Sequence, residues 1–130
     1  ELAFCTLDRE HKQLQFSGAN RPLYLVRKSQ LTEIKGDRMP IGYYGDHLSF
    51  TCHQQQLKEN DCIYLFSDGY VDQVGGPDKK AFRKKRFREL LCQNSEKDMK
   101  EQKQILEDTL DEWQGTREQI DDILVIGLRV

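Results

Sequence analysis

The stretch CIYLFSDGYVDQ, residues 62–73, joins the pattern of a buried strand to an acidic turn. Its first five residues, CIYLF, are apolar on both faces, which is typical of a central strand. The run ends in Ser67, Asp68 and Gly69, and glycine permits a tight turn there. The sequence therefore predicts a carboxylate at the carboxyl end of a buried strand.

A second stretch, QIDDILVIGLRV at residues 119–130, has the opposite order, because Asp121 and Asp122 come just before an apolar run. In an all-parallel sheet, Asp68 and this acidic pair would lie on opposite edges. If the two strands are antiparallel neighbours, the acids meet at one edge, where adjacent strands are about 4.8 Å apart. The two stretches together therefore indicate acidic groups that an antiparallel strand pair brings close.

Carboxylates in such proximity repel each other unless a cation lies between them or one stays protonated. Oxygen ligands without histidine or thiolate suit Mg²⁺ or Mn²⁺. The hypothesis is a metal site shared by Asp68 and Asp121, with Gly69 letting the backbone turn close to the ion. The alternative is that both acidic stretches are ordinary solvated turns.

The stretches before residue 62 alternate between apolar and polar residues, whereas those after residue 80 have helical spacing. Ser95 with Asp98 resembles a capping box, and Gly115 is the expected C-cap of the last helix. Many consecutive strands joined by short turns favour antiparallel sheets with helices packed against them, an α+β fold in a single domain over residues 1–130. The expected strands are 2–7, 13–18, 22–27, 29–35, 47–57, 62–66 and 123–130, the expected helices are 81–93 and 99–113, and the expected loops are 36–46 and 75–80.

The composition excludes several classes of protein. The 130 residues carry a net charge of −2, and no apolar run approaches the roughly 20 residues of a membrane span. There is no signal-peptide pattern, and the chain starts inside an alternating pattern, so we expect a cytoplasmic fragment of a longer protein. The three histidines are expected at the surface or in strands. Four cysteines without metal-site spacing are expected to be buried, reduced thiols: Cys5, Cys52, Cys62 and Cys92.

The run KKAFRKKRFR holds seven basic residues between Lys79 and Arg88. One interpretation is contact with nucleic acid or an anionic membrane. The favoured interpretation is a helix with a solvated basic face and its phenylalanines in the core, and a third is docking of an acidic protein partner. We therefore expect neither nucleic-acid binding nor membrane contact.

Polar residues in two turns also have two interpretations. Asn20 and Arg21 precede a strand that begins at a proline, and Arg38 lies in a loop rich in glycine and proline. Substrate binding by Asn20 or Arg21, or phosphate binding by Arg38, is the alternative to a structural role in the turns. Trp113 and Leu110 are expected in the core.

Five separated blocks carry a resemblance to a known family: FSGANRPLYLVR, MPIGY, DCIYLFSDGYVDQ, FRKKRFRELL and QIDDILVIGLRV. In this order they resemble the second half of the SpoIIE-type bacterial phosphatases, which belong to the metal-dependent PPM serine/threonine phosphatases. The resemblance covers nearly the whole chain. It implies a β-sandwich of two antiparallel sheets flanked by helices, here incomplete, which follows sensor or receiver modules in signalling proteins.

The resemblance also implies a site and a chemistry. Two Mn²⁺ or Mg²⁺ ions lie at one edge of the sandwich, and a hydroxide that bridges them attacks phosphoserine or phosphothreonine directly. Asp68, followed by Gly69, resembles the metal-binding acid of the Ser-Asp-Gly block, and Asp121 resembles the acid of the final block. Asp122 takes a position that is often asparagine in eukaryotic relatives. Asp72 is interpreted as a helix-start residue, with an accessory metal or bound water as the alternative.

The chain departs from the family in one large respect, because it has no block resembling the upstream DCTGHG motif. The aspartate of that motif bridges both metals in the family. We therefore expect this fragment to bind metal weakly and to be inactive alone. The missing strands would leave apolar edges exposed, so self-association is also expected.

These observations support two functions and disfavour a third. The resemblance implies a phosphatase domain that acts on a phosphoprotein, such as a regulator of the anti-sigma-factor antagonist kind. The second function is a pseudophosphatase module that binds a phosphoprotein without turnover. A phosphoacceptor receiver domain is disfavoured, because its acids follow parallel strands, whereas Asp121 precedes its strand.

Overall fold

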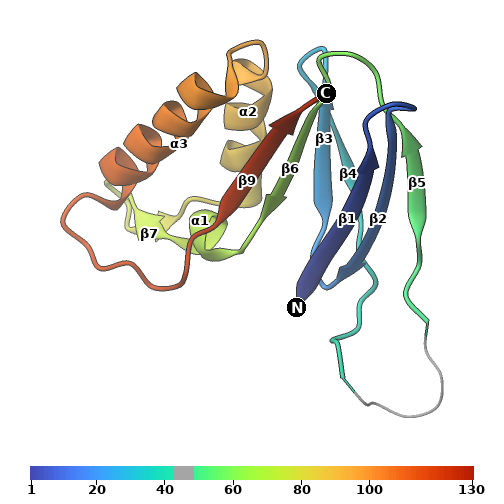
Figure 1. The fold of residues 1–130 in the computed structure, drawn as a ribbon. Helices are drawn as coiled ribbons and strands as arrows, with labels where there is room; N and C mark the ends of the chain where they lie inside the picture. The colour runs from blue at the N-terminus through green and yellow to red at the C-terminus, as the bar shows by residue number, and fades with distance from the viewer. Residues whose placement is uncertain (43–48) are drawn as a thin grey trace.

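The computed structural model describes residues 1–42 and 49–130, and it consists of two antiparallel sheets with helices packed against one of them (Figure 1). One sheet has the strand order β1-β2-β5, and the other has the order β4-β3-β6-β9. The strands of the first sheet are β1 Leu2–Asp8, β2 Gln13–Ala19 and β5 His53–Gln56. Those of the second sheet are β3 Leu23–Arg27, β4 Gln30–Ile34, β6 Cys62–Phe66 and β9 Val125–Arg129.

The helices and a small ribbon lie between β6 and β9 in the sequence. The short helix α1, Gly69–Asp72, follows β6 directly, and β7 Val74–Gly75 pairs with β8 Lys80–Ala81. Two longer helices follow, α2 Lys84–Asn94 and α3 Met99–Gln114. Both contribute to the core on one face of the four-stranded sheet, and Figure 1 shows the two helices together on the same side of β6 and β9.

Two hydrophobic cores lie on opposite faces of the four-stranded sheet, because its central strands are apolar on both faces. The core between the sheets contains Leu14, Phe16, Leu23, Leu25, Leu57 and Ile63. The core under the helices contains Tyr24, Val26, Cys62, Tyr64, Phe66, Tyr70, Val71, Phe82, Phe87 and Leu91. This arrangement confirms the predicted antiparallel, helix-flanked α+β fold.

The free edges of the two sheets carry apolar side chains that the described residues leave exposed. Phe4 on β1 is 59% exposed, and Ile126 on β9 is 44% exposed. β1 and β9 are each the last strand of their sheet. None of the helices that the structure describes is long and apolar enough to cross a membrane.

The strand predicted over residues 47–57 is shorter in the structure, where β5 begins at His53. The backbone of Thr51 is bonded by side chains instead of by a neighbouring strand. Its N–H donates to the Asp37 carboxylate at 2.7 Å, and its carbonyl accepts from Ser17 Oγ at 2.9 Å. Cys52 is consequently exposed, so the prediction of a buried thiol is wrong there. His47 lies outside the described residues.

The burial of the other residues that were predicted in the core agrees better with the prediction. Among the other cysteines, Cys62 is buried, and Cys5 and Cys92 are partly buried. Trp113 and Leu110 are half-buried against the core under the helices.

The helix boundaries differ from the prediction in two places. α2 begins at Lys84 and not at residue 81, because Arg83 has a φ of 76°, which no α-helix contains. The N-cap of α3 is Asp98 and not Ser95, since the Asp98 carboxylate accepts a hydrogen bond from the N–H of Glu101. Gly115 ends α3 as predicted.

A partly buried ion pair joins the end of β3 to the turn before β6 within the four-stranded sheet. The side chain of Asp61 is 1% exposed, and it accepts hydrogen bonds from Arg27 Nε at 2.8 Å and Arg27 Nη2 at 2.6 Å. The N–H of Lys58 donates to the same carboxylate at 2.8 Å. Burial raises the pKa of Asp61, but these bonds outweigh burial and hold the pKa below its ordinary value.

We expect this pair to make the protein less stable in acid. Because the pKa of Asp61 is lower in the folded chain than in the unfolded chain, its contribution is complete above the unfolded value of about 3.9. The contribution is lost as the pH falls through the folded value. Urea unfolding from pH 5 to pH 2 measures this loss, and Asp61→Asn should have a flatter profile across that range. Equal slopes for parent and variant would contradict the assignment.

Candidate functional site

The two acidic blocks lie at the same end of one antiparallel strand pair. β6 pairs with β9 in the register Phe66↔Val125, so the residues after β6 meet the residues before β9. This pairing confirms the predicted antiparallel relation of the two strands. Asp68 and the pair Asp121 and Asp122 therefore come from segments that are adjacent in space (Figure 1).

Ser67 fastens the two acidic blocks to each other. Its Oγ donates to the carbonyl of Asp122 at 2.8 Å and accepts from the N–H of Leu124 at 2.9 Å. The N–H of Ser67 also donates to the carbonyl of Leu124 at 3.0 Å. One serine therefore holds the segment that carries the Asp pair against the end of β6, a role that the sequence alone did not reveal.

Gly69 is required by the close approach of that same segment. A Cβ placed on Gly69 would overlap the carbonyl oxygen of Asp122 and would lie 2.9 Å from its carbonyl carbon. It would also lie 3.0 Å from Cγ1 of Ile123. Glycine is therefore needed for space, which agrees with the expectation that it lets two backbones come close.

Arg21 is the cationic side chain bonded to Asp68. Its Nη2 lies 2.9 Å from Asp68 Oδ1 and also contacts the Glu1 carboxylate. Arg21 follows Asn20, which has a φ of 57°, and its carbonyl packs against Gly18 and Gly36, where no Cβ would fit. The turn between β2 and β3 therefore holds Arg21 firmly beside the acidic block. Arg38, the other candidate arginine, is exposed.

Asp121 and Asp122 lie in an exposed turn that local bonds stabilise. Asp121 Oδ1 accepts from the N–H of Asp122 at 2.7 Å, and the carbonyl of Asp121 accepts from the Gln119 side chain at 2.7 Å. The structure thus brings the backbones of the two acidic blocks together. Within residues 1–42 and 49–130, no three metal-ligating side chains form a group that could hold an ion.

The available donors suit Mn²⁺ or Mg²⁺ in kind but not in number. Asp68, Asp121 and Asp122 offer only oxygen atoms, which hard divalent cations prefer. Mg²⁺ takes six ligands in an octahedral arrangement, more than these residues supply. The assignment of Asp68, Gly69, Asp121 and Asp122 to a metal site therefore stays a prediction.

Gln73 is a further residue that shapes the site and was not singled out in the sequence. Its side chain is fully buried and donates to the carbonyl of Glu118 at 3.0 Å. Its carbonyl accepts from Nε1 of Trp113 at 3.0 Å. These bonds hold the segment after α3, which leads to Asp121, against the segment after α1. Asp72, expected at a helix start, is the exposed last residue of α1.

A groove of about 490 Å³ runs between α3 and the free edge of β9. Its wall begins at Ile123, immediately after the acidic pair, and continues along β9 to Gly127. The side chains that α3 and the neighbouring elements contribute are mostly apolar: Tyr64, Tyr70, Met99, Leu106 and Leu110. The groove adjoins the acidic blocks but contains none of their carboxylates.

Comparisons with known proteins agree with this arrangement. The family model for stage II sporulation protein E (SpoIIE) matches residues 1–130. The SiaA-PP2C domain of Pseudomonas aeruginosa is 32% identical, with a TM-score of 0.90 over 98% of this chain and 50% of that chain. A search of curated proteins gives no match.

Two more distant structures share the fold. The phosphatase domain of SpoIIE from Bacillus subtilis is 18% identical, with a TM-score of 0.73 over 99% of this chain and 55% of that chain. A Mycobacterium tuberculosis structure of RsbU and RsbW domains is 19% identical, with a TM-score of 0.71 over 98% of this chain and 35% of that chain. The chain spans about half the length of the first two of these structures.

Proposed function

Because the chain belongs to the SpoIIE family and has the fold of its PP2C-type phosphatase domains, we propose that it is the C-terminal half of a metal-dependent protein serine/threonine phosphatase domain. One observation carries the proposal. Pairing of β6 with β9 places the block Ser67-Asp68-Gly69 against Asp121 and Asp122, and both Ser67 and Gly69 serve that contact.

Asp68 and Asp121 would hold Mn²⁺ or Mg²⁺, with Gly69 and Asp122 beside them. Such an ion supplies Lewis-acid activation of water and neutralises charge on the phosphoryl group. The residues of this chain position the two carboxylates, and Arg21 holds the Asp68 side chain in place. The remaining ligands would come from the other half of the domain, so the 130-residue chain alone would not turn over substrate.

The substrate class that fits this site is a phosphoserine or phosphothreonine protein. A regulator of the anti-sigma-factor antagonist kind is the partner that we propose, in the cytoplasm and under the control of a sensor or receiver domain. The matched M. tuberculosis structure contains an RsbW domain beside its RsbU domain, which supports a place in a signalling chain. The exposed apolar edges of β1 and β9 support self-association of the isolated chain.

The test is hydrolysis of a phosphoserine peptide by a chain extended at its N-terminus to the length of the matched domains. We expect Mn²⁺-dependent turnover that falls at least about 100-fold in Asp68→Asn, because a ligand to the activating ion is lost. Asp72→Asn, a matched change at an exposed acid four residues on, should retain turnover. Equal activity of the parent and Asp68→Asn would refute the metal assignment.

A second candidate function is a pseudophosphatase that binds phosphoproteins without turnover. The observation that favours it is the ion pair of Arg21 with Asp68, in which a protein cation already neutralises the carboxylate. The same assay separates the two functions. An extended chain that binds the phosphopeptide but stays inactive at every Mn²⁺ concentration would be a binding module.

A further inference from the structure

Five basic side chains gather on the β7–β8 ribbon and the start of α2, and we call them the basic platform: Lys79, Lys80, Arg83, Lys84 and Lys85. Residues 79–88 contain seven basic and no acidic side chains. The rest of the chain therefore holds 13 basic and 22 acidic side chains, a net charge of −9. Residues 79–88 are thus a strongly positive segment in an otherwise acidic chain.

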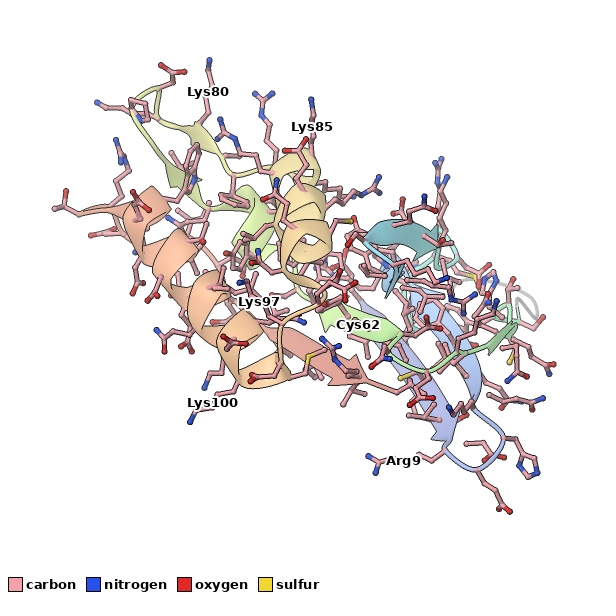
Figure 2. The ribbon with its side chains drawn as sticks, turned by 90° about the horizontal axis from the view of Figure 1, so that it is seen from above. Arg9, Cys62, Lys80, Lys85, Lys97 and Lys100 are labelled. Carbon is pink, nitrogen blue, oxygen red and sulfur yellow. The ribbon has the colours of Figure 1, made fainter. Side chains whose placement is uncertain are left out.

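The basic platform is exposed and almost free of ion pairs. All five side chains are exposed, and in the part of the chain that the structure describes their one ion pair joins Lys80 to Asp78 at 3.5 Å. Figure 2 shows Lys80 and Lys85 pointing outward on one side of the molecule, with Lys100 on the opposite side. The platform is therefore a positive surface that the fold itself does not neutralise.

Two other basic residues of the same segment have structural roles and are not part of the platform. Arg86 stacks over the ring of Trp113, with its guanidinium carbon 4.3 Å from the ring centre. Arg88 donates to the hydroxyl of Tyr24 and pairs with Glu33. Within residues 79–88, two arginines therefore pack against other side chains of the fold, and the five residues of the platform are exposed to solvent.

The start of α2 also lacks the features that normally stabilise a helix start. Arg83 occupies the N-cap with φ 76° and ψ 149°, a conformation that favours glycine, and its side chain caps no N–H. Lys84 and Lys85 open the helix, where the helix dipole favours acidic residues, and the first turn contains none. The side chains at this helix start therefore do not stabilise it, as is expected where a surface serves binding.

The platform rests on a rigid base next to the acidic blocks. Phe82 is buried with edge-to-face contacts to Tyr70 and Trp113. The N–H of Arg83 donates to the carbonyl of Val71 at 2.7 Å. Val71 lies in α1, three residues after Asp68, and so about 5 Å along the helix from it. The backbone of Arg83, within the platform, is therefore held close to the helix that follows Asp68.

From this position and charge we propose that the basic platform docks an acidic surface of the phosphoprotein substrate, beside its phosphorylated residue. This inference rests on the proposed function. Complementary charges on two exposed surfaces mainly raise the rate at which the two proteins associate and favour the correct partner. A flank of Asp and Glu next to the phosphorylated side chain is the chemistry that would recognise these five exposed cations, of which only Lys80 has an acidic partner among the described residues.

The buried aromatic side chains argue against two other anionic partners. Single-stranded nucleic acids need exposed rings on which bases stack, and a membrane surface needs exposed apolar side chains. Phe82 is 4% exposed and Phe87 is 0% exposed, so the platform presents charge alone. The net charge of −9 on the rest of the chain would also disfavour a long polyanion more than a short acidic segment.

Binding can be measured without metal and without turnover, so it stands apart from the test of hydrolysis. The probes are two fluorescent phosphoserine peptides, one flanked by glutamates and the other by glutamines, in anisotropy titrations with the 130-residue chain. We expect the glutamate peptide to bind about tenfold more tightly at low salt, and the difference to shrink near 0.5 M salt. The triple variant Arg83→Gly, Lys84→Gln, Lys85→Gln should lose this preference.

Two controls show whether lost binding comes from the platform: the thermal stability of the triple variant, and a variant that removes charges elsewhere. Arg83→Gly suits the backbone conformation at that residue, so the triple variant should unfold at a temperature no lower than the parent's, and lost binding cannot reflect lost folding. Lys97→Gln with Lys100→Gln removes two exposed charges from the region of α3 and should keep the preference (Figure 2).

Several results would overturn the proposal. Equal affinity for both peptides would remove its basis, as would an equal loss of affinity in the control variant. Tighter binding of the parent to duplex DNA or to phosphatidylserine vesicles at the same salt would show a general polyanion surface instead. If an extended chain prefers the acidic peptide but is inactive, the proposed docking role of the platform stands, and only the proposed phosphatase activity is refuted.

Discussion

Gly69→Ala is expected to lower the free energy of unfolding by about 3 kcal/mol and to separate the two acidic blocks. The added methyl group would overlap the Asp122 carbonyl, whose atoms belong to the backbone and cannot rotate away as a flexible side chain could. Relief requires that the segment of Asp122 move, which breaks its bonds to Ser67. Urea unfolding measures the stability, and the amide NMR signals of Ser67 and Leu124 report the displacement.

Gly115→Ala is the matched control. Gly115 has a φ of 59°, and a Cβ there would meet no atom within 4 Å. The change should cost about 1 kcal/mol, from backbone strain alone, and should leave the amide signals of Ser67 and Leu124 in place. Similar losses for Gly69→Ala and Gly115→Ala would show that space at Gly69 is not the limiting factor.

Phe87→Ala should lower the free energy of unfolding by about 4 kcal/mol, because it opens a cavity in the core under the helices. Phe87 is 0% exposed, and its ring lies 5.0 Å from the ring of Phe66 and 4.9 Å from that of Tyr70. It thereby joins α2 to β6 and α1, the elements on either side of Asp68. Thermal or urea unfolding followed by far-ultraviolet circular dichroism is the measurement.

The control for this change is Phe4→Ala on the edge strand β1. Phe4 is 59% exposed, so its loss leaves no cavity and should cost less than about 1 kcal/mol. A small effect of Phe87→Ala would mean that the core can collapse around the missing ring, and that α2 is not anchored through this residue.

The central part of the fold could be predicted because its sequence signals are consistent with one another. The run that forms β6 is apolar on both faces, and it becomes the strand with a core on each side. The order of acids and apolar runs suggested that the last strand is antiparallel to this one, and the pairing of β6 with β9 confirms it. The long helix α3 followed its apolar spacing, and Gly115 marked its end.

Short elements were missed because they have too few residues for a periodic pattern. α1 has four residues, and β7 and β8 have two each. Their positions depend on tertiary bonds, such as the bond from the N–H of Phe82 to the carbonyl of Gln73. The capping residue of α3 was misplaced because Ser95 and Asp98 are both good N-caps, and the end of α2 occupies Ser95.

The candidate site was predicted at the level of the backbone but not of the side chains. The sequence located Asp68, Gly69 and the Asp pair, but the bonds of Ser67 and the burial of Gln73 appear only in three dimensions. The ion pair of Arg21 with Asp68 joins residues that are 47 positions apart, and no local pattern reports such a contact. Ser67 could have been suspected, since it directly precedes the acid.

The pairing of β6 with β9 also has a consequence for the order of folding. Phe66 and Val125 are about 60 residues apart in the sequence, whereas the β1–β2 and β3–β4 hairpins close over a few residues. Closing a long loop costs more chain entropy, so such contacts tend to form after local ones. The two acidic blocks should therefore meet only in a late step, when the rest of the four-stranded sheet is already in place.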